Sequence, residues 1–200
     1  MYKSMLFKFF ESDSYFIDEK VNMFKFANEY KIYDQDATQI GMIKQKVSGG
    51  HKALRLLINK AMMPFHMEIQ DQTGEVQTVI KRGWTFFMSK IQVLDGSGNE
   101  IGRINQKFKF LKPEFRIFDT TGAQIATING DWKGWNFKIT NMSGEQIGTI
   151  SKKWAGVAKE LFTSADKYNV SIDPAYPEDN NKALILSTAI TIDMVLKEAK

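Results

Sequence analysis

The sequence predicts a mainly β fold: a closed antiparallel barrel of about twelve strands around a hydrophobic C-terminal helix. Five hairpin patterns support this prediction, because in each an apolar strand ends at Asp or Asn and a second strand begins a few residues later. These turns begin at Asp34, Asp71, Asp95, Asp119 and Asn141. In four of the five, Gly follows three residues later and supplies the left-handed conformation that a tight turn needs. The prediction also rests on the mostly apolar segment 183–196, which is the candidate for the enclosed helix.

The composition is that of a folded protein with a large core. Hydrophobic residues make up 43% and aromatic residues 12%, which excludes a disordered chain. We expect a single domain over residues 1–200. The chain contains no cysteine, so disulfides, thiolate catalysis and cysteine metal sites are excluded. A net charge of +4 and a pI of about 9.1 favour an anionic partner without identifying it.

The first elements follow from local patterns ahead of Pro64. Strands are predicted at 15–21 and 23–27, and the second shows strict alternation of apolar and polar residues. A first hairpin spans 29–46. Apolar residues at helical spacing predict a short amphipathic helix over 48–61, which Pro64 ends.

The remaining hairpins follow one another without a linker. They begin at Ile69, Val93, Ile117 and Ile139, which are 24, 24 and 22 residues apart. This repeat of strand pairs is typical of an antiparallel meander.

The last return strand, near Gly148, departs from strict alternation. Ile147 and Ile150 are three residues apart and fall on opposite faces of a regular strand. Either a bulge near Gly148 realigns them or both faces are covered. Beyond it, the sequence predicts helical character near 157–161 and a further strand at 170–172.

The apolar segment 183–196 has two interpretations, a buried core helix or a membrane anchor. It has 14 residues and carries Asp193, whereas a membrane-spanning helix needs about 20 apolar residues. Its length therefore favours a core helix, with Asn180 or Asn181 as the N-cap. A closed ring of about a dozen strands is too wide to be filled by strand side chains alone. We therefore expect the helix to fill the barrel lumen and the barrel to shield the apolar helix from water.

A specific run of residues extends from Gly148 to Val170. It contains Ile-Ser-Lys-Lys-Trp and Phe-Thr-Ser-Ala-Asp, and Lys182-Ala-Leu and Ile192-Asp193 follow it. Earlier matches are Tyr15 to Val21 and Pro64-Phe65 ahead of Ile69-Gln-Asp71. Together these segments resemble the phospholipid scramblase family, part of the tubby-like superfamily, over nearly the whole chain.

The resemblance implies a twelve-stranded barrel around a central helix and association with anionic phospholipid. In some members it also implies calcium-dependent movement of lipid between leaflets. The implied calcium ligands here are Asp166, Asp173 and Asp179. However, Ser164 stands where the family has an acidic residue, and Lys167 adds positive charge beside Asp166. A calcium site and a structural aspartate that caps a turn both remain as interpretations. These departures favour the second, so we expect no cofactor.

Basic and aromatic residues interleave in two segments, 81–87 and 107–116. One interpretation is an ordinary strand with its basic residues facing water. A second is that Lys and Arg contact lipid headgroups while an aromatic side chain enters the interface. A third is nucleic-acid binding, in which the basic residues follow phosphates and the aromatic rings stack on bases. The candidate lipid-binding residues are Lys81, Arg82, Trp84, Lys107, Lys109, Lys112 and Arg116.

Sequence motifs of catalysis are absent. There is no His-x-x-x-His, Gly-x-Ser-x-Gly or P-loop, and the two histidines are His51 and His66. We therefore expect a non-enzymatic protein, and the lack of cysteine suits a cytoplasmic one. The resemblance and the mildly basic charge imply that it binds anionic phospholipid at a membrane surface, and the resemblance adds lipid translocation as a further activity. The alternative is a nucleic-acid-binding or regulatory barrel. A carrier of a small apolar ligand is a third hypothesis, which a lumen filled by the protein's own helix would oppose.

Overall fold

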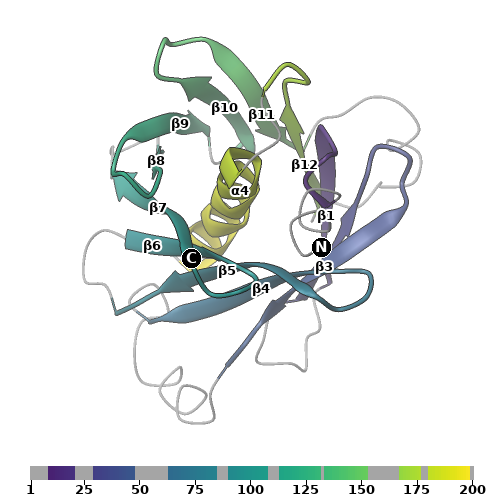
Figure 1. Cartoon of the computed structure of the whole chain (residues 1–200). Helices are drawn as coiled ribbons and strands as arrows, with labels where there is room; N and C mark the ends of the chain where they lie inside the picture. The colour runs from purple at the N-terminus through teal and green to yellow at the C-terminus, as the bar shows by residue number, and fades with distance from the viewer. Residues whose placement is uncertain are drawn as a thin grey trace.

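Twelve antiparallel strands form a closed barrel around one long helix, which confirms the predicted fold class (Figure 1). The computed structural model describes residues 9–20, 29–47, 63–84, 90–107, 113–131, 133–152, 167–176 and 180–198. The strands are β1 (Ser14–Lys20), β2 (Glu29–Tyr33), β3 (Gln39–Gln45), β4 (Phe65–Asp71), β5 (Val76–Arg82), β6 (Lys90–Asp95), β7 (Glu100–Lys107), β8 (Glu114–Phe118), β9 (Gln124–Asp131), β10 (Asn136–Asn141), β11 (Gln146–Ser151) and β12 (Lys167–Ile172). Each strand pairs with its neighbours in the chain, and β1 pairs with β12, so the sheet has no free edge.

Alternation along the strands gives the barrel wall an inner and an outer face. In β10, Phe137 and Ile139 are fully buried, whereas Lys138 between them is exposed. In β12, Tyr168 and Val170 are buried in the same way. The inward residues form one continuous core that includes the helix. Burial of this apolar surface, at roughly 25 cal/mol per Å², is the main force that holds the ring around the helix.

A β-bulge explains the irregular spacing of the last return strand. β10 and β11 pair regularly up to Ile139 and Gly148, and the register then shifts by one residue, which leaves Ile147 as the extra residue. The bulge turns Ile147 toward the core, and both Ile147 and Ile150 are buried there. The predicted bulge near Gly148 is confirmed.

The hairpin turns share one hydrogen-bond pattern. In the β4–β5 turn, Asp71 Oδ1 accepts hydrogen bonds from the backbone N–H groups of Thr73 (2.8 Å) and Glu75 (3.0 Å). Gly74 takes the left-handed conformation, with φ of 87°. In the next three hairpins Gly98, Gly122 and Gly144 have φ of 89°, 84° and 83°. The predicted roles of Asp or Asn and Gly in these turns are confirmed.

The first hairpin turn differs, because Ala37 occupies its left-handed position with φ of 61°. We expect Ala37→Gly to raise the free energy of unfolding by about 0.5 kcal/mol. Relief of about 1–2 kcal/mol of backbone strain exceeds the entropy cost of about 0.5–1 kcal/mol that glycine adds. Gly122→Ala is expected to lower the free energy of unfolding by about 1 kcal/mol. Urea denaturation measures both changes, and a less stable Ala37→Gly protein would contradict the strain argument.

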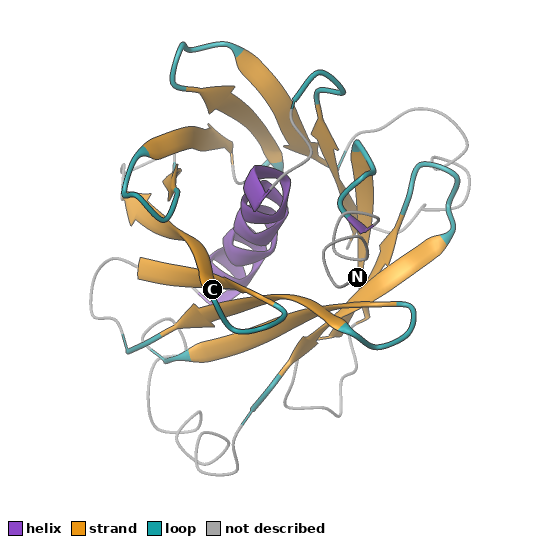
Figure 2. Cartoon of the chain, viewed as in Figure 1, coloured by secondary structure: helices purple, strands orange, loops and turns teal. Residues whose placement is uncertain are grey.

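The helix α4 (Asn180–Glu198) lies inside the barrel (Figures 1 and 2). From residue 183 to residue 195 its side chains are at most 8% exposed, and it packs against β5, β7, β8 and β12. The core-helix interpretation is therefore confirmed. The predicted N-cap is wrong, because the helix begins at Asn180, so Asn180 and Asn181 lie within it. Among the described residues, no helix combines the length and apolar character needed to cross a membrane.

Two polar contacts link α4 to the barrel near its two ends. Lys182 Nζ lies 2.8 Å from Asp13 Oδ1, just ahead of β1. The Tyr30 hydroxyl donates a hydrogen bond of 2.8 Å to Asp193 Oδ2. Because Lys182 and Asp193 are both buried, these contacts satisfy charged groups that water does not reach.

Three predicted elements lie outside the described residues. They are the strand at 23–27, the amphipathic helix at 48–61 and the helical segment near 157–161.

Candidate functional site

The barrel has two different ends. The turn end carries the five hairpin turns, which span 34–38, 71–75, 95–99, 119–123 and 141–145. The opposite end, here called the loop end, is where β5 ends, β6 begins and β7 ends. Since consecutive strands are antiparallel, residues that are far apart in the sequence meet at the same end.

Basic side chains gather at the loop end on three adjacent strands. Lys81, Lys90 and Lys107 neighbour inward-facing residues of β5, β6 and β7, so alternation places all three on the outer face. Lys90 and Lys107 are exposed and Lys81 is half-buried. Trp84 lies two residues after the end of β5 and is 51% exposed. These four residues are called the loop-end patch.

The structure brings together three of the predicted lipid-binding residues and adds one. Lys81, Trp84 and Lys107 were candidates from the two basic and aromatic segments. Lys90 was missed because it lies outside both segments, and only the strand order places it between β5 and β7. The sequence signal for Lys90 was weak, because a single lysine before the alternating residues from Ile91 onward does not show which other residues lie beside it.

Arg82 points into the barrel and not toward solvent, which corrects its assignment to the basic surface. It is 3% exposed, and its guanidinium donates a hydrogen bond from Nε to the Met63 carbonyl oxygen at 3.2 Å. The same group lies 4.5 Å from the centre of the Phe65 ring. Because side chains alternate along a strand, Lys81 and Arg82 cannot share a face. Arg82 is therefore a structural residue.

Arg116 lies on the outer face of β8, and a neighbouring carboxylate offsets its charge. Its Nε is 2.8 Å from Glu114 Oε1, and the Glu114 side chain is largely buried. We therefore leave Arg116 out of the loop-end patch. The candidates Lys109 and Lys112 lie outside the described residues.

His66 adds no positive charge to this region at neutral pH. Burial lowers its pKa below the usual value of 6.5, and nearby Lys81 lowers it further, while Glu68 acts in the opposite direction. The charge of the loop-end patch therefore comes from lysine alone.

The described part of the chain offers little support for calcium binding. Asp173 Oδ1 accepts a hydrogen bond from the backbone N–H of Ala175 at 2.8 Å, as in an aspartate that caps a turn. Asp166 and Asp179 lie outside the described residues, and within those residues no group of three or more metal-binding side chains occurs.

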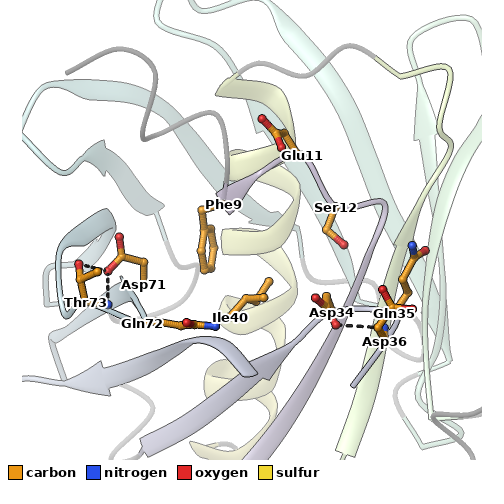
Figure 3. Close-up of a pocket in the computed structure, with 10 residues that line it drawn as sticks. All are labelled: Phe9, Glu11, Ser12, Asp34, Gln35, Asp36, Ile40, Asp71, Gln72 and Thr73. Carbon is orange, nitrogen blue, oxygen red and sulfur yellow. Dashed lines mark hydrogen bonds between the residues drawn. The ribbon is translucent and has the colours of Figure 1, made fainter. Parts of the chain in front are cut away.

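A pocket of about 520 Å³ opens at the turn end (Figure 3). It lies between the segment around Phe9 and the β2–β3 and β4–β5 turns. Its acidic side chains include Asp34 and Asp71, whose Oδ1 atoms hold the two turns through backbone hydrogen bonds. The sequence did not predict this pocket, because three separate segments build it. Its ten lining residues are Phe9, Glu11, Ser12, Asp34, Gln35, Asp36, Ile40, Asp71, Gln72 and Thr73.

A closed barrel filled by its own C-terminal helix places the protein in the tubby-like class of folds. The scramblase family model matches residues 17–198, and the chain belongs to the scramblase family.

Two further comparisons found similar proteins. "Altered inheritance rate of mitochondria protein 25" of Saccharomyces cerevisiae is 22% identical over 209 residues, which cover 85% of this chain and 64% of that protein. The chain thus matches less than two thirds of that relative's length. A solved structure of a protein from Arabidopsis thaliana superposes with a TM-score of 0.57 at 12% identity, covering 92% of this chain and 93% of the other. That likeness concerns the fold alone.

Proposed function

We propose that this protein binds the surface of membranes that contain anionic phospholipid, and that the loop-end patch makes the contact. The observation that carries the proposal is an exposed tryptophan beside three outward-facing lysines on adjacent strands. Membership of the scramblase family supports a lipid-related function for the protein.

The chemistry of the loop-end patch suits an anionic lipid surface. Each lysine near such a surface contributes roughly 1 kcal/mol of attraction, and salt screens it. Tryptophan prefers the boundary between headgroups and acyl chains, where its ring is apolar and its N–H still finds a partner. None of the three lysines forms an ion pair with another described residue, so their charge is available to a ligand.

The proposal concerns binding at the surface. Movement of lipid between leaflets would need a change in structure, because the strands enclose the side chains of α4 from residue 183 to residue 195. The same enclosure argues against the carrier hypothesis, since the helix already occupies the lumen.

Vesicle cosedimentation tests the proposal. We expect binding to vesicles with 30% phosphatidylserine at low salt, little binding to pure phosphatidylcholine, and loss of binding as salt is raised. Lys107→Gln is expected to weaken binding about fivefold, the effect of roughly 1 kcal/mol. Lys138→Gln removes the same charge from the outer face of β10 and is the matched control, with a change below about twofold.

Two outcomes would overturn the proposal. One is no binding to acidic vesicles at low salt. The other is salt-sensitive binding to a single-stranded oligonucleotide without vesicle binding, which would favour the nucleic-acid interpretation.

A further inference from the structure

The hairpin turns make one end of the barrel strongly acidic. The segments 34–38, 71–75, 95–99, 119–123 and 141–145 together contain seven Asp or Glu residues and no Lys or Arg. Turn chemistry does not require this charge, because Asn141 holds its turn with the same backbone hydrogen bonds that the aspartates accept in theirs. Several of the seven, such as Asp36 and Glu145, are not the residues that begin a turn. The turn end therefore carries more negative charge than its fold needs.

The loop end carries more positive than negative charge. Lysines lie at or next to the loop-end termini of seven strands: Lys20, Lys46, Lys81, Lys90, Lys107, Lys152 and Lys167. Acidic residues lie at or next to the loop-end termini of four strands, Glu19, Glu29, Glu114 and Asp131, so the lysines outnumber them. Two of them have acidic partners, since Lys46 lies 3.3 Å from Glu68 and Lys167 lies 3.4 Å from Asp18. At the turn end, by contrast, Lys182 near the start of α4 is buried and forms an ion pair with Asp13, so it does not offset the acidic turns. The barrel is thus an electric dipole along its own axis.

The length of the barrel makes this dipole important at a membrane. Strands of about seven residues span roughly 20 Å, whereas the field of a charged surface falls off over about 10 Å at 0.1 M salt. With the loop end on an anionic membrane, the lysines lie within the field and the acidic turns lie outside it. With the barrel on its side, acidic turns would approach the surface and be repelled. Charge therefore favours one orientation.

We propose that the barrel stands on the anionic membrane on its loop end, with its axis upright. The turn end and the pocket lined by Phe9 and Ile40 then face the water. This inference rests on the proposed function and adds to it the orientation of the barrel.

Single-cysteine labelling tests the orientation directly, because the chain has no cysteine of its own. Gly83→Cys places a label beside Trp84 at the loop end, where an added Cβ meets no atom within 4 Å. Ser143→Cys places one in the exposed β10–β11 turn, and Ser97→Cys places one in the exposed β6–β7 turn, at the far end of two strands that carry the loop-end patch. With a polarity-sensitive fluorophore and phosphatidylserine vesicles, we expect a blue shift and quenching by brominated lipid at position 83. Positions 97 and 143 should be unchanged. A shift at position 143, or a shift at position 97 equal to that at position 83, would overturn the upright orientation.

A charge-matched pair of double variants gives an independent test. Lys90→Gln with Lys107→Gln lowers the net charge by two at the loop end. Ser97→Glu with Ser143→Glu lowers it by two at the turn end, at exposed positions. We expect the first pair to weaken vesicle binding about 20-fold and the second to weaken it less than about twofold.

The two proposals fail in different ways. If the wild-type protein does not bind acidic vesicles, the proposed function fails. If it binds but both pairs weaken binding equally, net charge alone governs binding and the orientation is wrong. Circular dichroism of each variant establishes that the fold is retained before binding is compared.

Discussion

Asp13→Asn is expected to lower the free energy of unfolding by about 3 kcal/mol, because it leaves Lys182 charged, enclosed and without its carboxylate. The Lys182 side chain is 0% exposed, and its Nζ lies 2.8 Å from Asp13 Oδ1. Removal of one partner from a buried ion pair costs about 3–5 kcal/mol. We place this pair at the low end because the Asp13 side chain is 38% exposed. Urea denaturation followed by circular dichroism measures the change.

The converse variant is the control for Asp13→Asn. Lys182→Met removes the buried charge, and the aspartate left behind still reaches water, so we expect a loss of about 1 kcal/mol or less. The double variant should then be more stable than Asp13→Asn alone. If Asp13→Asn and Lys182→Met lower the free energy of unfolding equally, the cost of burying the Lys182 charge does not explain the effect of Asp13→Asn, and the argument fails.

The fold was predictable because its signals are local. Asp or Asn followed by Gly marks a turn through backbone geometry alone, and the apolar segment 183–196 needs cover whatever surrounds it. The ion pair between Asp13 and Lys182 carries no such signal. Its partners are 169 residues apart in the sequence, and only closure of the barrel brings them together.

The candidate surface was only partly predictable, for a reason that Arg82 illustrates. Counting basic and aromatic residues along the chain groups Arg82 with Lys81, although the strand period of two sends them to opposite faces. Because Ile80 is apolar and faces the core, alternation from it predicts that Lys81 faces outward and Arg82 inward. What the sequence did not show is that β5 continues as far as Arg82. Lys90 was missed for the complementary reason, since its place in the patch depends on strand order.

Gly102→Ala is expected to cost about 2–3 kcal/mol, because β7 and α4 approach each other too closely at this point for a methyl group. A Cβ added to Gly102 would lie 2.8 Å from both Cδ atoms of Leu184, and it would also meet the Phe118 carbonyl oxygen. Leu184 is fully buried on α4, so it cannot move into solvent to make room. The same denaturation experiment measures the loss, and Gly83→Ala, where the added Cβ meets no atom within 4 Å, is the matched control.

The double variant with Leu184→Ala separates the two contacts of the added methyl group at Gly102. Leu184→Ala alone should cost about 2–5 kcal/mol through the cavity it leaves. If the contact with the helix causes most of the loss in Gly102→Ala, the added methyl group fills part of that cavity, and the double variant loses less than the sum of the single losses. Additive losses would place the strain in the β7–β8 pairing, at the Phe118 carbonyl. The comparison therefore tests whether the enclosed helix sets how closely the barrel wall can be packed.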